Sequence, residues 1–176
     1  FSEPMLLSFT GEYPQKVDGK GRMSIPASFR RVLEANDPDW AEGLPAKLYI
    51  NYGAHLKQNL RIYSVKAMMK IDAQIQELDE GSELQILLNR LYLGQSEELS
   101  IDKDGRIVMP IRHREKLGMT EGEVTFMGLG NYFEVWKAET YSSAVTTSLD
   151  ALVERLAGGA DPLSLIAKQK KTEGGA

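Results

Sequence analysis

The chain has 176 residues, of which 42% are hydrophobic and 26% are charged, and its formal net charge is −4. This composition is typical of a folded globular protein with one or two small domains and excludes a disordered chain. It also excludes a uniformly basic nucleic-acid coat protein, although a local basic patch is compatible with a negative total charge.

The first half of the chain predicts a strand, a tight turn and a strand, followed by a short helix and a hairpin. In the turn, Asp18 can accept hydrogen bonds from backbone amides, and Gly21 can adopt a positive φ angle. Pro26 ends the second strand and presets the first turn of a helix. Residues 34–47 are rich in Pro, Gly and Asp and predict a loop, and residues 48–64 predict two strands joined by a turn.

Two helices are expected between the halves of the chain. Residues 64–79 show weak amphipathic periodicity, and residues 82–95 show a stronger pattern with leucines on one face. Ser82 and Gln85 have the spacing of a capping box, which predicts that this second helix begins at Ser82. Further on, residues 123–137 predict a compact hairpin, and residues 140–157 predict an amphipathic helix.

The turn and its flanks occur twice in the sequence. The segments DGKGRMSIPASFRRVL (18–33) and DKDGRIVMPIRHREKL (102–117) align at a constant offset of 84 with six identities. Each copy is followed by strand, turn and strand ending in an aromatic residue, and then by a helix. We therefore expect an α+β fold in which the two repeats form a pseudo-twofold pair that shares one β-barrel, with the helices packed outside.

This repeat predicts the domain organisation of the chain. The expected parts are a first repeat over 5–66, a helical connector over 67–95, a second repeat over 96–139, a C-terminal helix over 140–157 and a flexible tail over 158–176, with a short helical piece around 163–167.

Basic residues gather around the first turn and not around the second. Residues 16–31 contain five basic residues and one acidic residue, net +4, whereas residues 97–116 are neutral overall. Lysine suits a phosphate, and arginine can form two hydrogen bonds with a guanine edge. The first turn is therefore a candidate nucleic-acid surface. Arg30 and its repeat counterpart Arg114 fit equally well a structural salt bridge to Asp18 or Asp102.

Five motifs resemble the MraZ family of bacterial transcriptional regulators, which are built from two SpoVT-AbrB-type repeats. The motifs are F-x-G-E-Y (9–13), DGKGR (18–22), I-P-A-x-F-R (25–30), DKDGR (102–106) and FEVW (133–136), and the resemblance covers roughly residues 5–157. It implies tandem swapped-hairpin AbrB-type repeats that form a double-split β-barrel. It also implies a ring-shaped homo-oligomer that binds direct repeats of double-stranded DNA upstream of the division and cell-wall gene cluster, including its own promoter.

The resemblance also implies which residues contact DNA. In the family, the first D-x-K-G-R turn is the DNA contact, which here gives Lys20, Gly21 and Arg22. Flanking basic residues in the wider superfamily fall on Lys16, Arg30 and Arg31, while Gln15 replaces a basic residue common there. The second turn keeps Arg106 but has Asp104 where the first turn has Lys20.

Cofactors, metals, a membrane and small-molecule substrates are not implied by these motifs. The absence of cysteine removes thiolate zinc sites and cysteine nucleophiles and fits a reducing compartment. No apolar run approaches the roughly 20 residues of a membrane span, and residues 1–10 lack the basic region of a secretory signal. We therefore expect a cytoplasmic protein, and the resemblance to a family of DNA-binding regulators implies that it is nucleoid-associated.

Three other function classes compete with a DNA-binding regulator. Catalysis is disfavoured because His55 and His113 have no metal-ligand spacing and no nucleophile or phosphate-loop motif occurs, so we expect a protein that is not an enzyme. An AbrB-type antitoxin would bind DNA with the same turn and a toxin through its tail. A pure assembly module would have no reason to gather basic residues on one turn.

Overall fold

The computed structural model describes residues 8–174. Within them the chain divides into two compact units, of which the first ends at Ala138 and the second begins at Glu139. The first residues of the expected first repeat, 5–7, and the last of the expected tail, 175–176, lie outside the described residues, as does most of the segment considered for a secretory signal.

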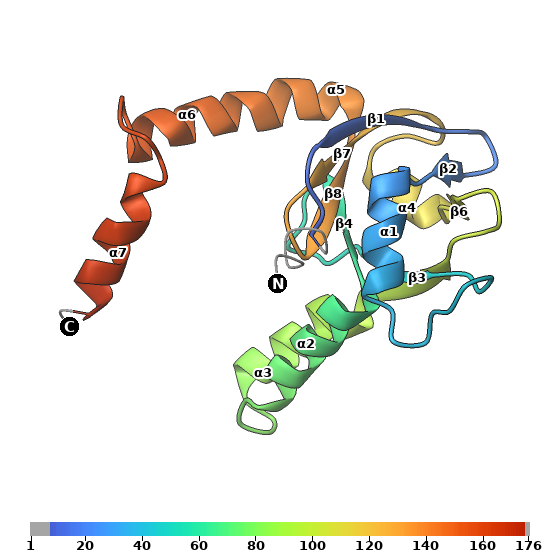
Figure 1. Cartoon of the computed structure of the whole chain (residues 1–176), viewed down its shortest axis with the longest axis horizontal. Helices are drawn as coiled ribbons and strands as arrows, with labels where there is room; N and C mark the ends of the chain where they lie inside the picture. The colour runs from blue at the N-terminus through green and yellow to red at the C-terminus, as the bar shows by residue number, and fades with distance from the viewer. Residues whose placement is uncertain (1–7, 175–176) are drawn as a thin grey trace. The chain divides into compact units, whose positions relative to one another are not determined.

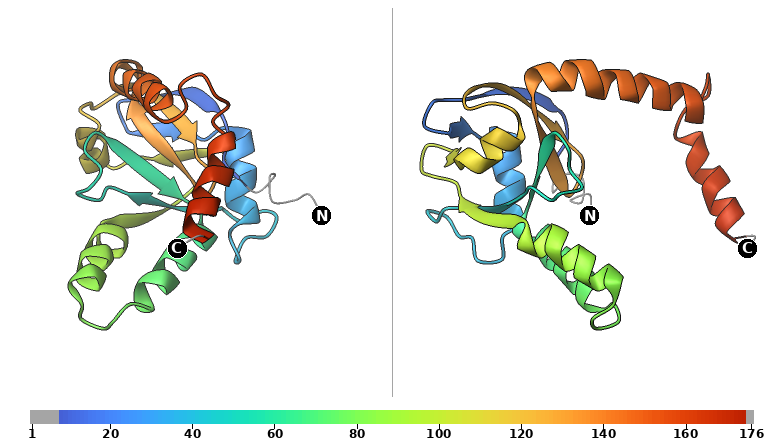
Figure 2. Two further views of the ribbon diagram at one scale, coloured as in Figure 1. Left: turned by 90° about the vertical axis from the view of Figure 1, so that its left-hand side faces the viewer. Right: turned by 180° about the vertical axis from the view of Figure 1, so that it is seen from behind.

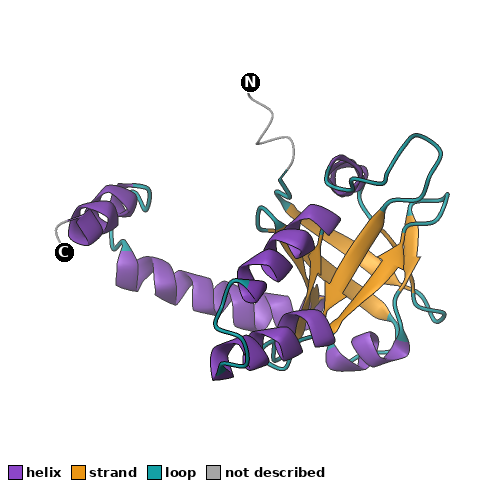
Figure 3. Ribbon diagram, turned by 90° about the horizontal axis from the view of Figure 1, so that it is seen from below, coloured by secondary structure: helices purple, strands orange, loops and turns teal. Residues whose placement is uncertain are grey.

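All the named strands belong to one antiparallel sheet in the first unit. The sheet has eight strands in the order β5-β3-β4-β8-β7-β1-β2-β6 and curls into a nearly closed barrel (Figure 3). The strands are β1 (Glu12–Val17), β2 (Arg22–Ser24), β3 (Lys47–Asn51), β4 (Asn59–Tyr63), β5 (Ser96–Ser100), β6 (Arg106–Val108), β7 (Gly122–Gly128) and β8 (Tyr132–Lys137).

The two repeats exchange strands within this barrel. β1 of the first repeat pairs with β7 of the second, and β5 of the second repeat pairs with β3 of the first. β2 pairs with β6 so that Met23 lies opposite Ile107, and these two residues are related by the repeat offset of 84. The pseudo-twofold axis therefore passes through this pair, and the expected double-split barrel of swapped hairpins is confirmed.

Aromatic side chains fill the barrel and fix the first helix against it. Phe9, Phe29, Phe126 and Phe133 are all at most 1% exposed, and the Phe29 and Phe133 ring centroids are 4.6 Å apart. Phe29 comes from α1 (Ala27–Ala35), which begins directly after Pro26, so Pro26 precedes the helix rather than forming its first turn. Burial of these rings is a large apolar contribution that holds α1 against the barrel.

The remaining helices of the first unit are α2 (Val65–Gln76), α3 (Glu83–Leu88), the π-helical η2 (Asn89–Gly94) and α4 (Ile111–Lys116). α2 and α3 lie side by side as a helical hairpin that projects from the barrel (Figures 1 and 2). The Ser82 side chain accepts a hydrogen bond from the Gln85 N–H, so the predicted helix start is confirmed.

The helix expected over 82–95 changes character after Leu88. It continues as η2 because barrel side chains take up its carbonyl groups: the Asn51 amide donates to the Leu91 carbonyl at 2.7 Å, and the Ser96 hydroxyl donates to the Tyr92 carbonyl at 2.6 Å. Side chains that compete for helix carbonyls favour such wide turns.

The second unit is helical. It contains α5 (Ala138–Thr140) from Glu139 onward, the π-helical η3 (Tyr141–Val145), α6 (Thr146–Leu156) and α7 (Ser164–Gly174). α7 is longer than the short helical piece expected around 163–167, and Asp161 accepts hydrogen bonds just before it from the Leu163 N–H and the Ser164 hydroxyl. Over residues 8–174, no helix is both long enough and apolar enough to cross a membrane.

Candidate nucleic-acid interface

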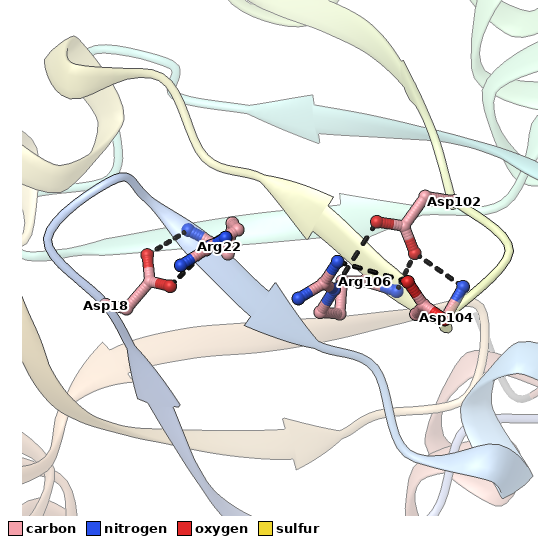
Figure 4. Close-up of polar contacts among 5 residues, drawn as sticks. All are labelled: Asp18, Arg22, Asp102, Asp104 and Arg106. Carbon is pink, nitrogen blue, oxygen red and sulfur yellow. Dashed lines mark hydrogen bonds and ion pairs between the residues drawn. The ribbon is translucent and has the colours of Figure 1, made fainter.

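The first turn, residues 18–22, is held by the side chain and backbone of Asp18. One carboxylate oxygen of Asp18 accepts hydrogen bonds from the backbone N–H groups of Lys20 and Arg22, each at 2.9 Å. Figure 4 shows the contacts between Asp18 and Arg22. The Gly21 N–H donates to the Asp18 carbonyl at 2.9 Å, with Gly21 at a φ of 86°. The turn is therefore rigid before any ligand binds, as the sequence predicted from its Asp and Gly residues.

Arg22 begins β2 and points away from the barrel. Its Nε lies 2.6 Å from the second carboxylate oxygen of Asp18, and its side chain is 43% exposed. The pKa of Asp18 is lowered, first by the hydrogen bond from the Arg22 backbone N–H and further by the Arg22 side chain, with desolvation opposing both. Asp18 is thus an ionised support that orients the Arg22 guanidinium.

The second turn, residues 102–106, repeats this geometry with one difference. Asp102 accepts from the N–H groups of Asp104 and Arg106 at 2.8 and 2.9 Å, and the same backbone contact from Arg106 is the main cause of the lowered pKa of Asp102. Arg106, however, forms ion pairs with both Asp102 at 3.4 Å and Asp104 at 3.2 Å (Figure 4). Its guanidinium therefore faces two carboxylates, where that of Arg22 faces one.

The pairing of β2 with β6 places both arginines on one surface. Met23 and Ile107 point inward and are 1% exposed, so the alternating side chains of Arg22 and Arg106 share the outward face. We call β2 and β6 together the β2–β6 ribbon. This ribbon brings Arg22 and Arg106 to one side of the barrel, and the exposed Lys20 precedes it in the first turn.

Arg30, on α1, contacts the turn of the other repeat. Its Nη1 donates to the Ile25 carbonyl at 2.5 Å, and its guanidinium lies beside Gly105 in the turn of the other repeat. Arg114 is the equivalent residue of the second repeat. It is 8% exposed, donates from Nε to the Met109 carbonyl at 3.0 Å, and lies beside Gly21. The expected salt bridges from these arginines to Asp18 or Asp102 are wrong, because each carboxylate pairs with the arginine of its own turn.

The two turn glycines are where each repeat touches the other. A Cβ on Gly21 would lie 2.5 Å from the Met109 carbonyl oxygen, and one on Gly105 would lie 2.6 Å from Nη1 of Arg30. The Met109 N–H also donates to the Gly21 carbonyl at 2.7 Å, and the Ile25 N–H to that of Gly105 at 2.9 Å. Both positions have a positive φ that favours glycine, and at Gly21 the close atom belongs to the backbone, so Gly21 shapes the interface through its backbone.

Acidic residues of the second repeat lie close to the basic residues of the first. Lys16 on β1 is exposed and directly opposite Glu123 on β7, and the Glu121 carboxylate lies 3.6 Å from the position of a Cβ on Gly19. Arg31 is on the exposed side of α1. Sequence reasoning missed these acidic neighbours because the β1–β7 pairing joins residues more than 100 positions apart.

The remaining charged cluster connects α4 to β5. His113 is fully buried, its Nε2 lies 2.9 Å from Glu97, and Arg112 pairs with the same carboxylate at 2.6 Å. Glu98 instead accepts a hydrogen bond from the Tyr49 hydroxyl, so these adjacent carboxylates point apart. Among the residues that the structure describes, no group of three or more His, Cys, Asp or Glu side chains could hold a metal ion.

The barrel is formed by two repeats that exchange strands, and each repeat has a rigid Asp–Gly–Arg turn. These features define the chain as a protein with two SpoVT-AbrB-type repeats. The family model described as "MraZ protein, putative antitoxin-like" matches residues 8–88 and 92–157. The chain belongs to the MraZ family.

Curated relatives match the chain over most of its length. A protein of Ruegeria sp. (strain TM1040) named "Transcriptional regulator MraZ" is 42% identical over 158 residues, which cover 90% of this chain and 94% of the relative. Proteins of the same name from Ruegeria pomeroyi and Parvibaculum lavamentivorans are 40% and 35% identical, covering 92% and 77% of this chain and 96% and 80% of the relatives.

Proposed function

We propose that this protein is a DNA-binding transcriptional regulator that reads the major groove with the β2–β6 ribbon. The observation that carries the proposal is the exposed Arg22 guanidinium, held at the start of β2 by an ionised Asp18. The names of the curated relatives support the regulatory role.

The ribbon suits this task in size and chemistry. The major groove of B-DNA is about 12 Å wide and admits a two-stranded β-ribbon. Asp18 engages Nε of Arg22, whereas the two terminal nitrogens of the guanidinium are the groups that reach O6 and N7 of a guanine. Arg22 therefore supplies base readout, and Arg106, which is paired with two carboxylates, does so less well.

Exposed basic residues around the first turn supply affinity for DNA that does not depend on the base sequence. Lys20 is exposed in the first turn, and Lys16 and Arg31 are exposed on β1 and α1. Each phosphate contact releases counterions, so binding weakens as salt rises. Glu123 opposite Lys16 reduces the contribution of that lysine, and the contacts of Arg30 with Ile25 and the second turn favour a structural role for that residue.

We also propose that the protein acts as a ring-shaped homo-oligomer on direct repeats, including repeats in its own promoter upstream of the division and cell-wall gene cluster, in the cytoplasm at the nucleoid. Exposed apolar side chains on the α2–α3 hairpin support self-association, namely Met69, Leu84 and Leu87, which are 57%, 53% and 51% exposed. Repeated weak contacts at fixed spacing then combine into strong binding. No catalytic step is part of this proposal.

The test is fluorescence anisotropy with the promoter duplex and a scrambled duplex of equal length, at several salt concentrations. Arg22→Ala is expected to lose the preference for the promoter while retaining its oligomeric mass in light scattering. Arg90→Ala, which removes an exposed arginine of η2, is the matched control and keeps the preference. A folded, assembled Arg22→Ala protein with unchanged promoter affinity would contradict the proposal.

A second candidate is an antitoxin that also binds a partner protein. The family description contains the word antitoxin-like, and α6 carries exposed apolar residues at helical spacing, namely Leu149, Leu152, Val153 and Leu156. If the protein shows no preference for the promoter duplex at any salt concentration, this candidate becomes the better one. Co-purification of the protein with the products of neighbouring genes would test it.

A further inference from the structure

The outward face of the β2–β6 ribbon combines three polar side chains with one apolar side chain. These residues are Arg22, Ser24, Arg106 and Val108. Val108 is 56% exposed although it belongs to a strand whose neighbouring residue Ile107 is 1% exposed. Its register partner across the ribbon is Arg22, and directly opposite residues have Cβ atoms about 4.5–5.5 Å apart.

Val108 breaks the symmetry of the two repeats. By the offset of 84 it corresponds to Ser24, so one half of the ribbon has a hydroxyl where the other has two methyl groups. The arginine of the same half, Arg106, is paired with Asp102 and Asp104. What the second repeat presents next to Arg22 is therefore an apolar side chain.

We propose that Val108 is a specificity-determining residue that contacts the C5-methyl group of a thymine adjacent to the guanine read by Arg22. This proposal rests on the proposed function and names the second base of the same site. The thymine methyl is the apolar group that base pairs display in the major groove. Successive base pairs are about 3.4 Å apart, so two side chains opposite each other on the ribbon reach neighbouring base pairs.

The experiment measures promoter affinity after thymines are replaced by deoxyuridine, which lacks only the methyl group. Replacement of the thymine that Val108 contacts should weaken wild-type binding about fourfold. This is the change in affinity expected when one buried methyl-sized group is lost. Val108→Ser, which places the residue of the first repeat at this position and removes both methyl groups, should bind the thymine and deoxyuridine duplexes equally. Val108→Thr, which keeps the β-branched shape and one methyl group, should retain part of the ratio and guards against loss of folding. Leu163→Ala, a truncation of an exposed apolar side chain that has no part in the proposed interface or ring, should keep the fourfold ratio.

The outcomes separate this inference from the proposed function. Promoter binding that depends on Arg22 but ignores deoxyuridine at every position overturns the role of Val108 alone, as does an unchanged ratio in a folded Val108→Ser protein. Absence of any promoter preference overturns both proposals. Support requires that the thymine sensed by Val108 be next to the base pair at which Arg22→Ala loses discrimination.

Discussion

At the scale of single residues, the interface depends on what lies beneath it. Arg22 is exposed, but the turn that presents it is packed on the Met109 carbonyl and on the Arg114 guanidinium of the other repeat. Arg114 is only 8% exposed, and its guanidinium donates hydrogen bonds to the carbonyl groups of Met109 and Thr120. A buried cation whose donors meet carbonyl groups is stable only if every contact is kept.

Substitution of Gly21 by alanine tests how closely the two repeats are packed at the first turn. Gly21→Ala and Gly43→Ala both place alanine at a φ near +87°, since the glycines have φ angles of 86° and 88°. A Cβ on Gly43 meets nothing within 4 Å, whereas one on Gly21 meets a backbone oxygen that cannot move independently. We expect Gly43→Ala to cost about 1–2 kcal/mol and Gly21→Ala about 2–5 kcal/mol of the free energy of unfolding in urea titration. Equal losses would show that the repeats separate easily at this turn.

At the scale of elements, features that depend on residues close in the sequence were predictable. Side-chain contacts that depend on the exchange of strands between the two repeats were not. The Asp–Gly–Arg turn, the inward and outward alternation of Met23 and Ser24, and the start of α3 depend on residues within a few positions of one another. The contacts of Arg30 and Arg114, and the acidic residues near the first turn, depend on which repeat supplies the neighbouring strand. Charge counts along the chain therefore overestimate the positive field at the first turn.

The attachment of α4 to β5 makes stability depend on pH. Burial lowers the pKa of His113 below 6.5, with the Glu97 hydrogen bond opposing, and burial likewise lowers the pKa of His55. Between the folded pKa and about 6.5 the unfolded chain binds more protons, so the free energy of unfolding falls as pH drops from about 7. Each histidine contributes at most about 1.4 kcal/mol per pH unit.

Urea unfolding at pH 7.5 and 5.5 measures this dependence, since histidine side chains are the main groups that titrate in the interval. His113→Gln retains a nitrogen donor for Glu97 but cannot titrate, so it should reduce the difference between the two pH values. His55→Gln, outside this contact, isolates the contribution of the other histidine. A wild-type stability that is equal or higher at pH 5.5 would contradict the assignment of a buried, neutral His113.

At the scale of the whole molecule, a chain of net charge −4 must bind a polyanion through a small part of its surface. One ribbon with a single favourable arginine gives few phosphate and base contacts, and its acidic neighbours limit the attraction further. In the proposed mechanism, affinity comes from several protomers that bind at once. The proposed ring supplies this, because linked sites raise binding about 10²–10⁴-fold when their spacing matches the ligand.

Operator spacing tests this multivalent mechanism directly. Duplexes with one repeat, with two repeats at the promoter spacing, and with five extra base pairs between the repeats can be compared by anisotropy. The extra half-turn moves the second repeat to the opposite side of the DNA, since B-DNA has about 10–10.5 base pairs per turn. We expect the promoter spacing alone to bind about 10²–10⁴-fold more tightly than a single repeat. The shifted duplex should match a control whose second repeat is scrambled. Equal affinity for one and two repeats would instead require that a single protomer bind DNA tightly, which one exposed Arg22 with a few nearby cations does not support.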